Sequence, residues 1–410
     1  MTFLVGESNQ QPWTYYVEQR KDGKIGTGTQ KDPFGDLQYA LDAVPDDSVL
    51  IIGEGVFSAS PVEEWERFCG NCESPEAPVK YTRGFHIRGK SVTIIGKGKE
   101  HTILQTNAGY GILVEDAEKV VLRGVKVTGG KRDEDGNATD AGIVVRRSKV
   151  VLDNVLIEGN NDVRKELAVG VGGIFGREGA LIHIDHSIIR ENSWDGIALY
   201  RGATATVIDT VIEKGRGAGV GVTWDASALL IRVIIRDYWK GIGAFSHASV
   251  VVKNALVVNQ VGWGVIAYGN ARIELWNSVV AKNGNCGVAF WSENASGLLI
   301  NNIIWKNGSK EQWVCPRVGL WNNARRENVL IRSNLFFGNY EKEIEGLEGI
   351  IGEYGNVAVD PLFVDEETFQ LQQGSPARDA GDAGILDPDA SRSDLGIYGG
   401  PFAWKTPKEG

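Results

Sequence analysis

Methionine and proline are scarce in this chain, and no strongly apolar stretch is long. Its 410 residues include one Met and 12 Pro. The longest apolar runs fall far short of the roughly 18 residues that a membrane-spanning helix needs, which argues against a transmembrane segment. Hydrophobic residues make up 42% of the chain and charged residues 23%, so the composition is that of a folded globular protein rather than a disordered one.

Positive charge is also in short supply. The 43 basic residues are outnumbered by 53 acidic ones, which gives a net charge of −10. This balance argues against a large nucleic-acid footprint. The opening residues 1–7 lack a basic stretch followed by an apolar one, so no signal peptide is visible. We leave the compartment open and favour a secreted protein over a cytoplasmic one.

Cysteine occurs only four times. Cys69 and Cys72 form a CxxC, but no second CxxC follows, so neither a zinc site nor thiol redox chemistry has much basis. The pattern favours a local disulfide in a surface loop or plain thiols. Cys286 precedes an expected strand, where we interpret it as a small buried hydrophobe.

Glycine, in contrast, is abundant, with 53 residues, and much of it follows a repeat. A unit of glycine, an apolar residue, a small residue and another apolar residue recurs, mostly at spacings of 22 or 23 residues and twice at 31. Each unit holds two or three short strands and lacks the helical period of a βαβ unit. The glycines that begin the units are Gly111, Gly142, Gly173, Gly196, Gly219, Gly241, Gly264 and Gly287.

Strands this short cannot each bury a face alone, so successive units must stack around a shared core. We therefore predict an all-β fold, a single-stranded right-handed parallel β-helix of about 10 coils with one coil per unit. A row of turn residues at one offset supports this register, because asparagine tolerates the left-handed backbone of a tight turn. The charged side chains of this row could form ion pairs with one another. The row is Asn154, His186, Asp209, Arg232, Asn254, Asn277 and then Asn301 or Asn302.

The two ends of the chain differ from the repeat. In residues 1–60 a short helix behind the N-cap Asp36 is expected to cover the open end of the first coils. Residues 61–84, with three prolines and the CxxC, are expected to form an inserted loop. The parallel β-helix is expected over 85–340, and residues 341–410 are expected to form a terminal coil and a capping tail.

Motifs near both ends of the chain resemble those of a known superfamily. The stretches GTQKDPF at 28–34 and LQYALDA at 37–43 are similar to the start of many bacterial β-helix proteins. Three later stretches are similar to their end. On these residues the chain resembles the pectin-lyase-like right-handed parallel β-helix superfamily over nearly its whole length. The later stretches are DPLFV at 360–364, GSPARDAG at 374–381 and DPDASRSDLGIYGGP at 387–401.

Members of that superfamily with known roles mostly act on polysaccharides, as lyases, glycosidases, uronate epimerases or phage tailspikes. The paired aspartates with Gly-His-Gly of polygalacturonases are absent here, and only WDGI at 194–197 resembles part of that set. The Asp-Pro-His-Asp pattern of alginate epimerases is absent too. The resemblance thus implies a carbohydrate-active protein and leaves the reaction open.

The register predicts which side chains face outward, because residues alternate in and out along a strand. One outward row is small and the next is mostly aromatic, which gives a shallow floor beside a rail on which sugar rings could stack. Alternatively, a loop or a second subunit covers these aromatics. The small row is Ala198, Gly221, Gly243, Ile266 and Ala289, and the predicted substrate-binding residues are Tyr200, Trp224, Phe245, Tyr268, Trp291 and Arg177.

Candidate chemical groups lie just past the aromatic row. Asp225 and His247 share one offset in consecutive units, so stacking should bring them about 5 Å apart. A carboxylate beside an imidazole fixes the tautomer of the ring, which suits a general acid or base. Arg201, one coil earlier, could neutralise a uronate carboxylate in a lyase reaction. The competing interpretation of the pair is an ordinary salt bridge at a turn.

Hydrolysis would instead require two carboxylates, for which Asp195, Asp225 and Glu293 are the candidates. Two insertions, residues 131–140 and 160–166, are expected on the same side of adjacent coils, where they could wall the groove. In the first insertion, Asp133 and Asp135 loosely resemble a calcium loop that lacks its final glutamate. We therefore consider calcium as a ligand there, and no other cofactor is indicated.

These observations predict a carbohydrate-active β-helix protein, a polysaccharide lyase or a glycoside hydrolase, with a groove on the helix face. Its partner would be a polysaccharide or oligosaccharide, and Arg201 could hold an acidic sugar. A non-catalytic glycan-binding or surface structural protein is the alternative. We expect neither a nucleic-acid partner nor a membrane span, and the sequence leaves the oligomeric state open.

Overall fold

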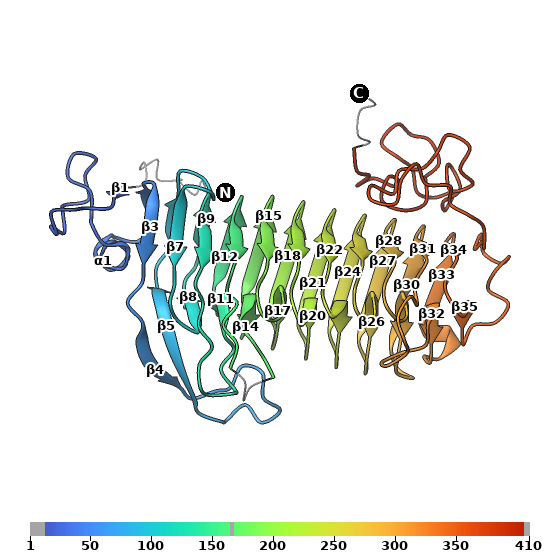
Figure 1. The fold of residues 1–410 in the computed structure, drawn as a ribbon, viewed down its shortest axis with the longest axis horizontal. Coiled ribbons are helices and arrows are strands. Elements are labelled where there is room, and N and C mark those ends of the chain that lie inside the picture. Colours follow the sequence, from blue (N-terminus) through green and yellow to red (C-terminus); the bar gives the residue numbers. More distant parts are fainter. Residues whose placement is uncertain (1–12, 165–167, 406–410) are drawn as a thin grey trace, which may run out of the picture.

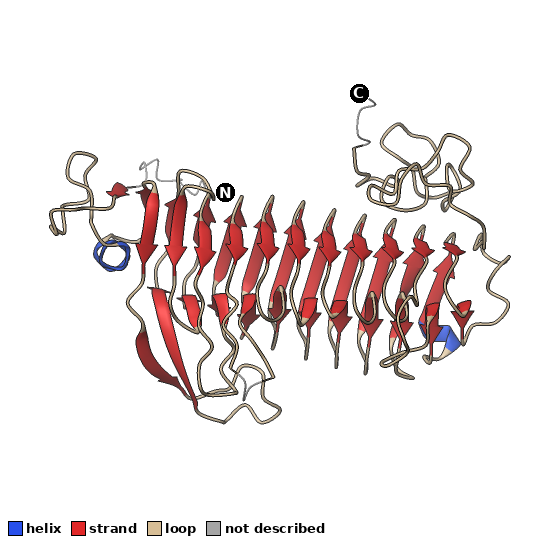
Figure 2. Cartoon of the chain, viewed as in Figure 1, coloured by secondary structure: helices blue, strands red, loops and turns tan. Residues whose placement is uncertain are grey.

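The chain forms three long sheets that run side by side along one axis (Figures 1 and 2). The computed structural model describes residues 13–164 and 168–405. Each turn of the chain adds one short strand to each sheet, and the sheets hold 12, 11 and 12 strands. The predicted all-β parallel β-helix, with about 10 coils, is confirmed.

The first sheet contains the strands that precede the predicted row of turn residues. Every pairing within it is parallel. Its strands are β1 (Thr14–Val17), β2 (Ser48–Ile52), β6 (Val92–Ile95), β9 (Val120–Arg123), β12 (Lys149–Asp153), β15 (Leu181–Asp185), β18 (Thr204–Ile208), β21 (Ser227–Ile231), β24 (Ser249–Lys253), β27 (Arg272–Trp276), β30 (Ser296–Ile300) and β33 (Val329–Arg332).

The second sheet consists of strands of three or four residues that follow those turns. Its strands are β3 (Gly55–Ser58), β7 (Thr102–Gln105), β10 (Lys126–Thr128), β13 (Leu156–Glu158), β16 (Ile188–Arg190), β19 (Val211–Glu213), β22 (Ile234–Arg236), β25 (Leu256–Val258), β28 (Val279–Ala281), β31 (Ile303–Trp305) and β34 (Leu335–Phe337).

The third sheet carries the glycine units. Its strands are β4 (Val62–Glu66), β5 (Val79–Arg88), β8 (Tyr110–Glu115), β11 (Ala141–Arg146), β14 (Gly172–Arg177), β17 (Ile197–Leu199), β20 (Ala218–Val222), β23 (Lys240–Ala244), β26 (Val265–Ala267), β29 (Val288–Phe290), β32 (Val318–Asn322) and β35 (Lys342–Glu345).

The recurring glycines lie where neighbouring coils come closest. A Cβ atom added at Gly241 would lie 2.3 Å from the carbonyl oxygen of Gly264 in the next coil. One added at Gly264 would lie 2.6 Å from the carbonyl oxygen of Gly287. No side chain fits in that space, so glycine is needed for the close approach of two backbones. The repeat in the sequence is therefore a steric requirement of stacking.

Inward side chains of successive coils stack into one continuous core. Ladder pairing joins Ile197 to Val220, Val220 to Ile242, Ile242 to Val265 and Val265 to Val288, and each is at most 1% exposed. Full burial of such a side chain stabilises a fold by about 1.5–3 kcal/mol. Because every coil contributes aligned apolar residues, the core extends along the whole helix.

The predicted turn row has the expected left-handed backbone. Its members all have φ between 45° and 60°. Asn301 is the member of this row, whereas Asn302 belongs to a buried ladder in which its amide nitrogen donates to Asn334 Oδ1 at 2.9 Å. The charged members also satisfy one another, because Arg232 donates to both carboxylate oxygens of Asp209 at 2.6 and 2.7 Å.

The predicted N-terminal helix is α1 (Leu37–Ala43), which lies beside the first coils (Figure 1). Asp36 caps it by accepting a hydrogen bond of 2.6 Å from the Tyr39 amide. Gln38 ties the helix to β5, because its side-chain oxygen accepts a hydrogen bond of 2.8 Å from the His86 amide. A single-turn 3-10 helix, η1 (Arg326–Asn328), also occurs. Within the described residues, no helix has the length and apolar character that a membrane span needs.

Residues 61–84 differ from the expected loop. Strand β4 pairs antiparallel with the first half of β5, and only residues 67–78 connect them without a strand. The neighbouring strand β8 supports this pair, because Tyr81 on β5 stacks on Tyr110 of β8 with ring centroids 4.4 Å apart. The prolines and the CxxC lie mostly in the connection, and they obscured the alternating pattern on either side of it in the sequence.

The C-terminal tail covers the side of the β-helix rather than its end. Residues 357–404 lie against the outer face of the second sheet, where Phe369, Leu371 and Ile397 pack in one cluster with Trp305 (Figure 1). The last coil is closed instead by Leu347 and Ile350, which join the main core. The tail binds here because the outward residues of the later strands of the second sheet are apolar.

Both cysteine pairs form disulfides. Cys69 bonds to Cys72, which is one of the two expected states. Cys286 is buried but is also bonded to Cys315, a partner that the sequence interpretation did not foresee. The two are 29 residues apart because residues 306–317 enlarge one coil. Because of this longer coil, Cys315 lies in the next coil, close enough to Cys286 to bond to it.

Candidate active site

The outward face of the third sheet carries the two rows that the sequence predicted. Ladder pairing joins Ala198 to Gly221, Gly221 to Gly243, Gly243 to Ile266 and Ile266 to Ala289. The small row is therefore a straight line across five coils. The aromatic row begins two positions further along the chain, and it faces the same side because side chains alternate along a strand.

The aromatic row changes from buried to open along the helix. Tyr200 is 7% exposed and packs beneath the CxxC loop. Tyr268 is 48% exposed, and its ring centroid lies 6.4 Å from that of Phe245 and 6.3 Å from that of Trp291. A loop thus covers the start of the row, while solvent reaches its middle.

A pocket of about 280 Å³ lies where the row becomes open. Its floor includes Ala198 and Gly221, and both the CxxC loop and the insertion 131–140 contribute to its walls. Asp195 is the only carboxylate and Lys240 the only cation among its described lining residues. The pocket is lined by Cys69, Asn71, Cys72, Gly136, Asn137, Ala138, Thr139, Val169, Phe175, Trp194, Asp195, Ala198, Tyr200, Ala218, Gly221, Thr223, Lys240 and Phe245.

Asp195 reaches the pocket from the turn before β17. Its Oδ1 accepts a hydrogen bond of 2.6 Å from the Ala218 amide in the next coil. Its Oδ2 lies 3.5 Å from the position of a Cβ atom added at Gly221, so glycine keeps the space beside it open. Burial raises the pKa of Asp195 to about 6, although the Ala218 amide and the charge of Lys240 oppose this. A carboxyl group that titrates near neutral pH suits general acid or base catalysis.

Lys240 supplies the positive charge of the pocket. It begins β23 and pairs with Ala218, so it lies one coil beyond the amide that binds Asp195. Its ammonium lies 5.4 Å from the ring centroids of both Trp239 and Trp263. Within the described residues, no carboxylate forms an ion pair with Lys240.

Arg201 and Trp224 hold the CxxC wall instead of lining the pocket. The Arg201 guanidinium stacks over the Trp224 ring at 4.6 Å and donates a hydrogen bond to the Cys72 carbonyl oxygen. The sequence predicted a neutralising role for Arg201 and a sugar contact for Trp224. In the structure the two side chains meet each other and fix the loop above Tyr200.

Asp225 and His247 lie on exposed turns after β20 and β23, aligned in consecutive coils as predicted. Asp225 accepts a hydrogen bond of 2.8 Å from the Gly202 amide, and His247 Nε2 lies 3.0 Å from Asn270 Nδ2. No ion pair joins these two described residues, and neither lines the pocket. The structure therefore shows no salt bridge between Asp225 and His247.

Glu293 and Arg177 also lie away from the pocket. Glu293, on an exposed turn, pairs with Arg325 at 2.9 Å. The Arg177 side chain has no exposed surface, because it is buried in an ion pair with Glu66 from β4. That burial leaves Arg177 no surface for contact with a substrate. The sequence placed Arg177 just past the aromatic row, whereas the ladder aligns it with Tyr200 in that row, and the sequence gave no sign of the partner that the β4–β5 pair supplies.

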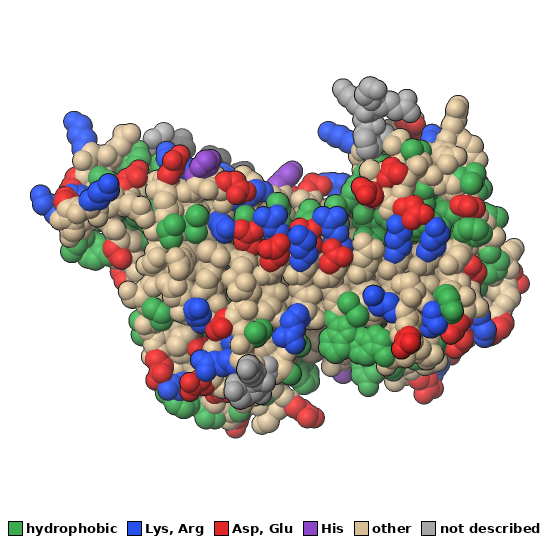
Figure 3. Space-filling view, viewed as in Figure 1, with side chains coloured by type: hydrophobic (Ala, Val, Ile, Leu, Met, Phe, Trp, Pro, Cys, Tyr) green, Lys and Arg blue, Asp and Glu red, His purple; other side chains and the backbone are tan. Residues whose placement is uncertain are grey.

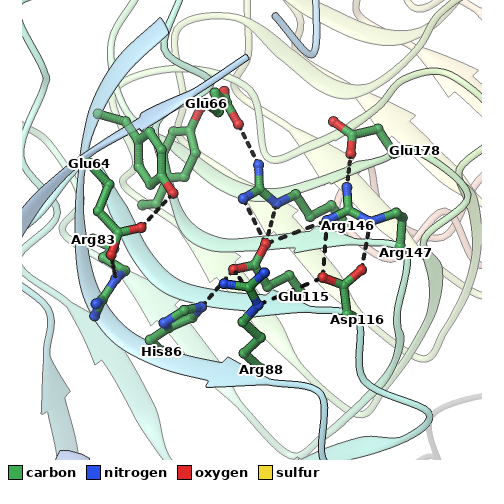
Figure 4. A network of polar contacts seen from close by, with 12 residues as sticks. Glu64, Glu66, Arg83, His86, Arg88, Glu115, Asp116, Arg146, Arg147 and Glu178 are labelled. Carbon is green, nitrogen blue, oxygen red and sulfur yellow. Dashed lines mark hydrogen bonds and ion pairs between the residues drawn. The ribbon is translucent and has the colours of Figure 1, made fainter. Parts of the chain in front are cut away.

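The same outward row continues upstream as a charged cluster that the sequence reasoning missed (Figure 4). His86 Nε2 lies 2.8 Å and Arg146 Nη2 lies 2.7 Å from the Glu115 carboxylate. Although burial opposes ionisation, the hydrogen bond from His86 and the charge of Arg146 lower the pKa of Glu115 to about 2. Glu115 and Arg146 follow their unit glycines at the offset of Tyr200, so the repeat itself could have located them.

The two aspartates expected to bind calcium already accept hydrogen bonds. Asp133 accepts them from the Thr82 amide at 2.8 Å and the Thr82 hydroxyl at 2.7 Å, and burial raises its pKa. Asp135 accepts them from the Lys80 and Asn137 amides, each at 3.0 Å. The bonds from Thr82 and Lys80 attach the insertion 131–140 to β5, and calcium binding there stays a prediction. Residues 165 and 166 of the second insertion lie outside the described residues.

One set of three potential metal-ligating side chains occurs in the described chain, on another face. The ligand atoms of Asp185, His186 and Asp209 lie within 4.8 Å of one another. However, Arg232 donates to both oxygens of Asp209, and His186 Nδ1 lies 2.9 Å from Asp185 Oδ1. The charges of this set are therefore satisfied within the protein.

Comparison with known proteins agrees with this architecture. The family described as right handed beta helix region matches residues 79–232 and 218–355. The pectate lyase Pel9A has a similar structure, with 13% identity, a TM-score of 0.53, and coverage of 94% of this chain and 96% of its own. A rhamnogalacturonan lyase is also similar, with 14% identity, a TM-score of 0.52, and coverage of 89% and 96%.

A search of curated proteins by sequence finds no match. The low identities to the solved structures show a shared fold. The family match covers well over half of the chain, along the stacked coils that hold the pocket. The chain therefore belongs to the right-handed β-helix family, and it shares its fold with these two lyases.

Proposed function

We propose that this protein is a polysaccharide lyase that cleaves a uronate-containing polysaccharide at the Asp195–Lys240 pocket. The observation that carries the proposal is the pairing of one carboxylate with a raised pKa and one unpaired ammonium in a single pocket. The pocket lies on the outward face of the stacked sheet, beside aromatic side chains.

β-Elimination needs a base and a positive charge. Above about pH 6 the Asp195 carboxylate is ionised and can take the proton from the uronate carbon next to the carboxylate. Lys240 stabilises the negative charge that builds up on that carboxylate. The electron pair of the broken C–H bond forms the C4–C5 double bond, and the glycosidic C–O bond breaks.

The leaving oxygen needs a proton, and Tyr200 lines the same pocket. Burial raises the pKa of Tyr200, and the negative charge of Asp195 raises it further, so the phenol stays protonated near neutral pH. Tyr200 is thus a proton donor for the departing oxygen, with water as the alternative donor.

Hydrolysis has less support, because it requires two carboxylates that flank the scissile bond. Asp195 is the single carboxylate of the described pocket lining. Of the other two candidates, Asp225 accepts a hydrogen bond from Gly202 and Glu293 pairs with Arg325. The two similar structures carry the names of a pectate lyase and a rhamnogalacturonan lyase, which agrees with the choice of lyase chemistry.

A non-catalytic glycan-binding protein is the second candidate. The observation that favours it is the open part of the aromatic row, where Tyr268 is 48% exposed. Such a protein would bind polysaccharide without forming any product.

The test is a panel of acidic and neutral polysaccharides, assayed with and without calcium. Ultraviolet absorbance reports the unsaturated ends that only a lyase makes, and a reducing-end assay reports any cleavage. We expect unsaturated ends from an acidic polysaccharide, with loss of at least about a hundredfold in Asp195→Asn. His247→Ala is the matched control and should retain activity.

Two outcomes decide against this assignment. If His247→Ala abolishes activity and Asp195→Asn does not, the base is His247, with Arg201 as the neutralising residue. If no product forms while the protein binds polysaccharide, the non-catalytic candidate holds.

A further inference from the structure

We propose that a tryptophan platform beside the pocket binds further sugar units of the same acidic polysaccharide. The platform consists of Trp239, Trp313 and Val261, whereas Trp263 is only 7% exposed and belongs to the buried cluster around Cys286 and Cys315. The inference rests on the proposed function, because it extends the binding groove from the Asp195–Lys240 pocket toward the second disulfide.

The platform contains two parallel indole rings that stack on each other, each of them partly exposed. Trp239 precedes β23, and Trp313 comes from the segment between β31 and β32, yet their ring planes differ by only 3° and their centroids are 4.7 Å apart. Trp239 is 37% exposed, Trp313 46% and Val261 44%. Figure 3 shows a hydrophobic area below the middle of the molecule, near β26, with basic side chains at its border. Exposed apolar area of this kind marks a binding surface.

The rings are held in place from both sides. A Cβ atom added at Gly262 would lie 3.3 Å from the Trp313 ring, so the ring packs directly on that backbone. Asn285 donates a hydrogen bond of 3.0 Å to the Glu311 carbonyl oxygen, and Cys315 is bonded to Cys286. Anchors on both sides of Trp313 keep it ordered before a ligand arrives, which lowers the entropy cost of binding.

Lys240 connects the platform to the pocket. Lys240 lines the pocket, and its ammonium lies 5.4 Å from the ring centroids of Trp239 and Trp263. A uronate whose carboxylate pairs with Lys240 would therefore have its ring at the edge of the platform. Neighbouring units of the same chain would then pack their apolar C–H faces against the exposed surface of the stacked Trp239–Trp313 pair. The combination of one cation with flat apolar rings fits an acidic polysaccharide.

The experiment measures binding without cleavage. Affinity electrophoresis through gels that contain polygalacturonate or alginate gives dissociation constants for Asp195→Asn protein, alone and combined with Trp313→Ala or Trp239→Ala. We expect each tryptophan variant to weaken binding of one of these polymers by about tenfold, while a trimer of the same sugar binds as before. Trp13→Ala, which removes a tryptophan that is 67% exposed elsewhere, is the matched control and should bind normally.

Further variants separate stacking from misfolding. Trp313→Tyr keeps a flat ring and should retain polymer affinity within about threefold, and the unfolding midpoint of each variant should match that of its parent. Unchanged polymer affinity in both alanine variants would refute the platform. The platform would also be refuted if these variants convert a dimer into a monomer in sedimentation experiments, because the rings would then form an interface between copies of the chain.

Failure of the platform is distinguishable from failure of the proposed lyase. Tryptophan-dependent binding without any unsaturated product would preserve the platform and refute the lyase. Unsaturated product that depends on Asp195, with polymer affinity unaffected by the alanine variants, would preserve the lyase and refute the platform.

Discussion

Replacing Asp195 by asparagine should stabilise the protein at neutral pH as well as inactivate it. The pKa of this carboxyl is about 6 in the folded protein, against 3.8 for an ordinary aspartate. At about 1.4 kcal/mol per pKa unit, the difference corresponds to about 3 kcal/mol that the ionised carboxylate costs the folded state. Asparagine keeps an oxygen that can accept the hydrogen bond from Ala218, but it carries no charge to desolvate.

The sign of the pH dependence follows from the direction of the shift. Because the pKa is raised on folding, the folded protein holds the proton of Asp195 more tightly than the unfolded chain does. The resulting stabilisation is fully present below pH 3.8 and is lost as the pH rises through about 6. Above that pH, the free energy of unfolding of Asp195→Asn should exceed that of the parent protein by up to about 3 kcal/mol.

The assay is urea unfolding, followed by tryptophan fluorescence, at several values between about pH 4 and about pH 8. The two unfolding curves should coincide at the acidic end and separate as the pH rises. Asp225→Asn is the matched control, because it removes an exposed carboxylate that does not line the pocket. If Asp195→Asn and the parent protein keep the same difference at every pH, the carboxylate is not desolvated, and the argument for its role as a base fails.

Three further changes test the fold. Gly241→Ala should prevent close stacking on Gly264 and lower the free energy of unfolding by about 2–4 kcal/mol in urea titrations; an unchanged value would mean that the coils can separate at no cost. Glu66→Gln should cost about 3–5 kcal/mol, because it removes the carboxylate that pairs with the fully buried Arg177, while Arg146 keeps Glu115; calorimetry should show a lowered Tm, and an unchanged Tm would mean that Arg177 does not depend on Glu66. Replacing Cys286 and Cys315 together by serine should lower stability by about 3 kcal/mol, and reductant should then have less effect on the variant than on the parent protein.

The regular part of the fold could be predicted because its rules are local and repeated. A glycine at one offset marks the point where two coils touch, so its spacing gives the register of the whole third sheet. That register correctly placed Ala198, Gly221 and Gly243 in one outward line. It also placed Asp225 and His247 at the same offset in consecutive coils. Alternation along each strand then separated core from surface.

The candidate site was harder to predict, because segments outside the repeat define it. The position of the pocket depends on where the CxxC loop lies over Tyr200, and the sequence gives no distance between those segments. Lys240 was not predicted because it precedes Gly241 in its unit, whereas the predicted outward rows consist of residues that follow each unit glycine. Asp195 was noticed only as a hydrolytic carboxylate, since its burial depends on the walls of the pocket.

The C-terminal tail has a mechanical consequence for the stacked coils. In a simple solenoid each coil contacts only its neighbours, so the end can unravel one coil at a time. Here the tail spans three coils: Asn254 donates to the Ile397 carbonyl oxygen at 3.0 Å, Asn277 donates to the Ser393 hydroxyl at 2.9 Å, and Asn301 accepts from the Asp382 amide at 2.7 Å. Pulling on the C-terminus would load this strap before any of those coils, which would then come apart together in a single rupture.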